Sequence, residues 1–182
     1  GAVAYLRVVD VNDNIHVTFV IGRARVAPIS EITIPRLELT AAVISVKLSK
    51  MIQEELDFPV DSVTYWTDST SVLKCIYNEK KRFHTFESNR LTIIRSGSSP
   101  SQWRYVSSED NPAADASKGL KLDAMLKNNR WLSGPEFLLQ DKPHWPANIA
   151  IPPITPSDPE VRRENSIYLT TVTESMSIRY PH

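Results

Sequence analysis

The amino-acid sequence predicts a mixed α/β domain that ends near residue 128 and continues into an irregular tail. Three observations support this fold class. Residues 1–27 resemble paired strands, residues 33–56 change to a helical period, and two short β-rich stretches then alternate with helical segments. The expected order is β-β-α-β-α-α-β-α, and this alternation favours a mixed sheet flanked by helices.

The first 27 residues are expected to form a β-hairpin. Residues 1–10 and 15–27 are rich in β-branched and aromatic residues, which favour strands. The letters VNDN between them supply turn-forming Asn and Asp. A hairpin is the natural arrangement for two strands joined by so short a connection.

A long helix follows the hairpin. Thr33 suits the N-cap position, and Pro35 falls in the first turn, where its missing N–H costs nothing. The apolar residues expected to face the core recur at helical spacing, and they are Leu37, Ala41, Ile44, Leu48 and Met51 or Ile52. The spacing predicts about six turns at about 3.6 residues per turn.

The remaining elements of the domain are shorter. The expected strands are residues 62–66 and 101–106, and the expected helices are residues 69–78, 83–96 and 111–126. In the last of these helices, Asn111 suits the cap, Pro112 suits the first position and Gly119 suits a break.

The chain divides into three parts on this basis. Residues 1–128 form the domain, and residues 129–145 are expected to be an irregular extension that packs on it. Residues 146–182 are interpreted as a linker, because seven of the 13 prolines lie between residues 141 and 182.

Composition excludes several classes of protein. The 182 residues, 41% of them hydrophobic, suffice for one core of ordinary size. Lys and Arg equal Asp and Glu at 21 each, so any nucleic-acid surface must be local. The single cysteine, Cys75, excludes an internal disulfide or a thiolate zinc cluster. No apolar run approaches the ~20 residues of a membrane span. We therefore expect a soluble, intracellular protein with no membrane partner.

Three acids lie at the ends of expected elements. Glu38 is near the start of the long helix, Asp68 ends the strand before residue 69, and Asp115 is in the first turn of the helix after Asn111. An α/β sheet can bring such ends to one edge, where Mg²⁺ or Mn²⁺ would neutralise the carboxylates. Two ions held there can cleave a phosphodiester. Each acid also has a purely structural interpretation, as a helix N-cap or an acid near a helix N-terminus.

A basic stretch lies between the two middle helices. Four cations are candidates for contacts with nucleic-acid phosphates, with Phe83 and Phe86 between them, and they are Lys80, Lys81, Arg82 and Arg90. The alternative is a solvated loop with two core aromatics.

Four motifs carry a resemblance to a known family. In order along the chain they are IPRLELTAAV, YWTDSTSVL, SQWRYVSSEDNPAADASKGL and RWLSGPEFLL. Over roughly residues 1–140 the chain resembles the ribonuclease H-like region of BEL/Pao-type LTR retrotransposon Pol polyproteins. That resemblance implies a ribonuclease H-like mixed sheet and metal-dependent cleavage of the RNA strand of RNA–DNA hybrids during reverse transcription.

The resemblance also implies residue roles and partners. Glu38 and Asp68 would bind two Mg²⁺ or Mn²⁺ ions, and Asp115 would bind metal and position water. The neighbours in the polyprotein would be a reverse transcriptase and an integrase. The expected location is a cytoplasmic virus-like particle or the nucleus.

Some features depart from the family pattern. Gly1 begins inside a strand-like stretch, so the first central strand and its metal-binding aspartate are expected to be missing. The motif reads NPAAD where relatives often have NPAD, and Tyr105 stands where many carry a histidine. Two further interpretations therefore remain open. One is an inactive relic that binds nucleic acid or protein, and the other is a structural module like a reverse-transcriptase connection domain.

Overall fold

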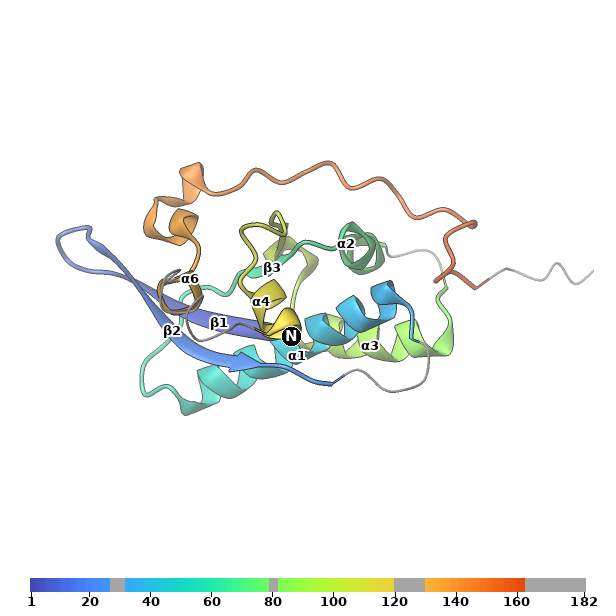
Figure 1. Cartoon of the computed structure of the whole chain (residues 1–182), viewed down its shortest axis with the longest axis horizontal. Helices are drawn as coiled ribbons and strands as arrows, with labels where there is room; N and C mark the ends of the chain where they lie inside the picture. Colours follow the sequence, from blue (N-terminus) through green and yellow to red (C-terminus); the bar gives the residue numbers. More distant parts are fainter. Residues whose placement is uncertain (27–31, 79–81, 120–129, 163–182) are drawn as a thin grey trace, which may run out of the picture.

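A computed structural model describes residues 1–26, 32–78, 82–119 and 130–162 (Figure 1). The chain opens with the expected hairpin, formed by β1 (Ala2–Val9) and β2 (Ile15–Arg23) in antiparallel register. Asp10 shapes the turn, because its carboxylate accepts hydrogen bonds from the backbone N–H groups of Asn12 and Asn14. Asp13 adopts the left-handed backbone conformation in this turn, with φ 63°.

The long helix is α1 (Ile34–Glu55), with Thr33 as its N-cap residue and a proline in its first turn, as predicted. Its buried face differs from the predicted one, since it consists of Leu39, Ala42, Val43, Val46 and Leu48. Of the predicted face only Leu48 is buried, and Met51 is exposed. The reason is that α1 packs against both α3 and β1, so tertiary contacts select among several apolar stripes.

Two further strands in the described part of the chain are β3 (Tyr65–Thr67) and β4 (Trp103–Tyr105), which pair in parallel with Tyr65 opposite Trp103. The rings of these two residues stack, with centroids 4.7 Å apart. The expected single mixed sheet is therefore wrong for the described residues, where the strands form two separate two-stranded sheets. A short hairpin turn joins β1 to β2, whereas the chain between the paired strands β3 and β4 includes the helices α2 and α3.

The core lies where α1 meets the next two helices, α2 (Thr70–Tyr77) and α3 (Thr85–Gly97). Leu73 and Ile76 of α2 and Ile94 of α3 are essentially inaccessible to solvent. Gly97 allows the close approach of α3 to α1, because a Cβ there would collide with Val46. A 3₁₀ turn, η1 (Pro100–Gln102), leads into β4.

The helical elements described after β4 are all short. They are α4 (Ala113–Lys118), α6 (Arg130–Ser133), η2 (Glu136–Leu139) and η3 (Lys142–His144). Trp131 packs on Phe19 of β2 with ring centroids 5.7 Å apart. Gly119 ends α4 with φ 76°, in agreement with the expected break. The part of the expected helix beyond residue 119 lies outside the described residues.

An aromatic cluster attaches residues 136–148 to both sheets. Trp66 of β3 contacts Phe137 and Trp145, at centroid distances of 4.8 and 5.7 Å. The Arg7 side chain from β1 donates to the Leu138 and Gln140 carbonyls, at 2.9 and 3.1 Å. The extension therefore connects β1 with β3, which share no hydrogen bonds.

The last described stretch, residues 146–162, first crosses the helices in an extended conformation and then ends in a turn (Figure 1). This stretch contacts the domain, because Ile151 and Ile154 pack on the core and Val161 is 5% exposed. The apolar residues between the prolines provide this attachment. Among the described helices, none combines the length and apolar character that a membrane crossing requires.

Candidate active site

Glu38 lies in the second turn of α1 and is held by a serine from another element. Ser69 Oγ donates to Glu38 Oε2 at 2.5 Å and accepts a hydrogen bond from Val72 N at 3.1 Å. Ser69 is only 5% exposed and is the N-cap residue of α2. This one hydroxyl thus joins the start of α1 to the end of β3, where Asp68 is located.

Asp68 follows β3 directly, as the sequence predicts. Its Oδ2 atom accepts a hydrogen bond from Ser108 Oγ at 2.7 Å. The backbone N–H of Val106 donates to the Thr67 carbonyl at 3.0 Å and draws the loop after β4 towards Asp68. The interpretation of Asp68 as a helix cap is wrong, because Ser69 caps α2, and the Asp68 carboxylate is free of that role.

Asp115 lies in the first turn of α4 and forms an ion pair with Arg130, with Oδ2 and Nη2 2.5 Å apart. Arg130 also donates to the Glu109 carbonyl. Tyr5 of β1 lies beside this pair, and its hydroxyl donates to the Trp131 carbonyl at 2.9 Å. Burial raises the pKa of Tyr5 to about 12, with opposing effects from Arg130 and Asp115.

The three acids therefore each have a separate protein partner. Glu38 is hydrogen-bonded to Ser69, which directly follows Asp68 in the chain. Asp68 accepts a hydrogen bond from Ser108, and Asp115 is paired with Arg130. Within the described residues, no group of three or more His, Cys, Asp or Glu side chains is arranged to hold a metal ion. The carboxylate oxygens have the right chemistry for Mg²⁺, but their roles as metal ligands and in catalysis stay predictions.

The basic stretch is only partly described, since Lys80 and Lys81 lie outside the described residues. Arg82 is exposed. Arg90 is half-buried, with its guanidinium carbon 3.3 Å from the ring centroid of Phe86 and its Nε donating to Thr40 Oγ1 at 3.0 Å. Burial lowers the pKa of Arg90. Arg90 therefore contributes to the packing of α3 on α1, and its phosphate-binding role stays a prediction.

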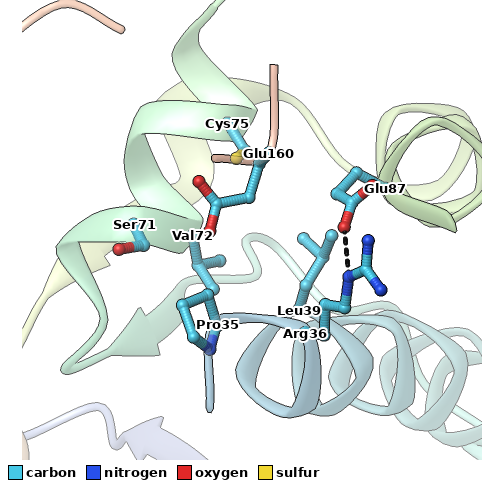
Figure 2. A pocket seen from close by; sticks show the side chains of 8 residues that line it. All are labelled: Pro35, Arg36, Leu39, Ser71, Val72, Cys75, Glu87 and Glu160. Carbon is cyan, nitrogen blue, oxygen red and sulfur yellow. Dashed lines mark hydrogen bonds and ion pairs between the residues drawn. The ribbon is translucent and has the colours of Figure 1, made fainter. Parts of the chain in front are cut away.

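A small cavity lies between α1, α2 and the stretch that contains Glu160 (Figure 2). Its volume of about 10 Å³ has room for about one water molecule. The lining carboxylate of Glu87 is 1% exposed and accepts a hydrogen bond from Arg36 Nε at 2.7 Å. Cys75 also lines the cavity, and burial, supported by nearby carboxylates, raises its thiol pKa to about 12. A thiol with such a pKa is unreactive at neutral pH.

Sequence reasoning did not assign the residues that hold the three acids. Ser69 has a detectable signal, because a serine directly after a strand and before a helical period suits an N-cap. Ser108 and Arg130 have none, since they contact Asp68 and Asp115 across 40 and 15 residues of sequence.

Comparison with known proteins gives one match. Residues 1–69 match the family model of the Pao retrotransposon-like RNaseH-like domain. No curated protein and no solved structure matches the chain significantly. The matched stretch contains β1, β2, α1 and β3, and with them Glu38 and Asp68, whereas Asp115 lies beyond it. The similarity to a Pao retrotransposon-like RNaseH-like domain thus extends over residues 1–69 of this chain.

Proposed function

We propose that this chain is a ribonuclease H-type nuclease module that cleaves the RNA strand of RNA–DNA hybrids during reverse transcription. The observation that carries the proposal is the hydrogen bond between Ser69 and Glu38. It links Glu38 to the residue that follows Asp68, and all three residues lie inside the stretch that matches the family. Carboxylates brought together at the end of a strand would suit hard divalent cations.

Each acid has a role in this proposal. Glu38 and Asp68 would hold Mg²⁺ or Mn²⁺, and Asp115 would complete the ligand set and orient the attacking water. When bound, a pair of such ions supplies water activation and stabilises the leaving oxygen. The chain's own contribution is to orient the carboxylates through Ser69, Ser108 and Arg130.

The resemblance to the family implies a fourth acid, carried on a further strand. We propose that this strand belongs between β1 and β3, which are not hydrogen-bonded to each other. It would join the two small sheets into one mixed sheet, and its aspartate would complete the site.

The proposed partners follow from the same chemistry. Arg82 is exposed and suits contacts with hybrid phosphates, together with Lys80, Lys81 and Arg90. Reverse transcriptase and integrase regions would be the neighbours in the polyprotein. The proposed setting is intracellular, in a virus-like particle or the nucleus.

A second candidate function is a catalytically inactive module that binds nucleic acid. The observation that favours it is that each of the three acids already has a protein partner. Arg130 in particular neutralises Asp115 in the way a metal ion otherwise would. A protein that keeps this fold and its basic residues would still bind a hybrid through phosphate contacts.

The two functions are separated by a cleavage assay on a labelled RNA–DNA hybrid with Mg²⁺. We compare the chain with Asp68→Asn and with Asp61→Asn, an exposed control that removes the same charge. The nuclease proposal expects cleavage by the chain and by Asp61→Asn but not by Asp68→Asn. Hybrid binding without cleavage by a folded chain supports the inactive module, and equal cleavage by all three excludes Asp68 from catalysis.

A further inference from the structure

Residues 155–162 form a compact turn on the surface of the helical core. The Asp158 carboxylate closes this turn, since it accepts hydrogen bonds from Thr155 N at 2.6 Å and from Thr155 Oγ1 at 2.9 Å. The Val161 N–H then donates to the Asp158 carbonyl at 3.0 Å. We call residues 155–162 the acidic turn, because they contain Asp158 and Glu160.

The acidic turn is attached to the connection between α2 and α3 by backbone pairing. The His84 N–H donates to the Glu160 carbonyl at 3.2 Å, and the Arg162 N–H donates to the Arg82 carbonyl at 2.9 Å. These two bonds bracket an antiparallel bridge between Phe83 and Val161. Val161 is 5% exposed, so an apolar side chain anchors the pairing. Figure 1 shows the stretch reaching this end of the helical layer after crossing the other elements.

The same contact brings opposite charges together. Asp158 Oδ1 lies 3.7 Å from Lys74 Nζ of α2, and the two side chains are 20% and 25% exposed. Hydrogen bonds from Thr155, with support from Lys74, lower the pKa of Asp158, so its carboxylate is ionised at neutral pH. Glu160 extends the acidic surface towards Ser71 and Pro35, beside the cavity (Figure 2).

We infer that the acidic turn is an autoinhibitory plug that competes with nucleic acid for the surface formed by Lys74 and Arg82. This inference rests on the proposed function, which assigns hybrid phosphates to Arg82, and it adds Lys74 as a further phosphate contact. The Asp158 carboxylate oxygens occupy the position beside Lys74 that the phosphate oxygens of a nucleic acid would take. The single ammonium group of Lys74 cannot pair fully with both anions. The backbone bonds at Arg82 and His84 hold the plug in place, and binding of a hybrid requires its release.

The test uses the whole chain and a pair of matched variants. Val161→Gln places a polar amide in the buried anchor position and should release the plug, whereas Val11→Gln makes the same change at a 99% exposed site in the hairpin turn. Hydrogen exchange at the His84 and Arg162 amides reports docking in the absence of nucleic acid. Fluorescence anisotropy with a labelled RNA–DNA hybrid, without divalent metal, reports affinity.

We expect Val161→Gln to lose protection at both amides and to bind the hybrid about tenfold more tightly. A tenfold gain is expected if the acidic turn leaves the surface free in about a tenth of the parent molecules and the variant frees it in all of them. Val11→Gln should match the parent chain in both readouts. Lost protection with unchanged affinity overturns the competition. Unprotected amides in the parent chain overturn the docking itself. Protected amides together with no hybrid binding by any variant overturn the proposed function, while the plug remains attached.

A second pair of variants tests the charge. Asp158→Asn and Asp61→Asn each remove one negative charge, but only the first lies at the plug. The inference expects a greater gain in hybrid affinity for Asp158→Asn. Equal gains would show that only the net charge matters, which overturns a specific role for the acidic turn.

Discussion

Replacement of Ser69 by alanine tests whether the joint between α1 and β3 is as strong as its geometry indicates. The buried hydroxyl makes two hydrogen bonds, one to Glu38 Oε2 and one from Val72 N. Loss of a serine N-cap costs about 1 kcal/mol of unfolding free energy. A hydrogen bond to a charged acceptor contributes about 1.5–3 kcal/mol, and we discount it to about 1 kcal/mol because Glu38 is half-exposed and water replaces part of it. The expected total loss is about 2 kcal/mol.

The measurement is urea denaturation followed by circular dichroism. With a denaturant slope of about 2 kcal/mol per molar urea, Ser69→Ala should lower the midpoint by about 1 M and leave the slope unchanged. Thr70→Ala is the matched control, since Thr70 is exposed and follows Ser69 directly. Its unfolding free energy should change by less than about 0.5 kcal/mol.

A double-mutant cycle with Glu38→Ala isolates the contact between the two side chains. If Ser69 holds Glu38, the coupling energy should be about 1 kcal/mol. A coupling energy of zero would refute the reasoning, as would a Ser69→Ala loss no larger than that of Thr70→Ala. In either case Glu38 and Asp68 would not be joined as described.

Two further predictions concern the backbone and the hairpin turn. Gly134→Ala should lose more than the about 1–2 kcal/mol of unfolding free energy that a positive φ alone costs an alanine, because the added Cβ meets Tyr5 and Val17 at 3.2 and 3.3 Å. A loss below about 1 kcal/mol in thermal denaturation would exclude crowding at 134. Hydrogen bonds from Asn14, with smaller contributions from other turn residues, lower the pKa of Asp10 from 3.8 to about 2. Its contribution to stability is present above pH 3.8 and disappears as the pH falls towards 2. An NMR titration should find this pKa, and Asp10→Asn should flatten the pH dependence of stability between pH 4 and 2; an Asp10 pKa near 3.8 would contradict the turn geometry.

Much of the local structure was predictable, because it depends on short-range physics. Strand and helix patterns indicate β1, β2, α1, α2 and α3, and the N-cap at Thr33 agrees with the structure. Asp68 was correctly placed at the end of β3 for the same reason, since side-chain type and period are visible within a few residues. The acids Glu38 and Asp68 also lie within the residues that match the family.

Other features depend on contacts between distant residues. The buried face of α1 was predicted wrongly, because several apolar stripes compete along one helix and packing against α3 and β1 selects among them. The packing of residues 151–161 on the core was not predicted, because the many prolines of this segment indicate a linker and only a few apolar residues make the contact. The single mixed sheet was also wrong for the described residues, because strand pairing is a choice between partners that local patterns do not reveal.

By itself, the sequence determined which elements form and at which element ends the three acids lie, because period, capping and turn chemistry act over one or two turns of chain. Only the tertiary structure decided what those acids contact. Ser69 meets Glu38, Ser108 meets Asp68 and Arg130 meets Asp115 across 31, 40 and 15 residues. Such pairs form only when packing brings separate elements within about 3 Å, the distance of a hydrogen bond.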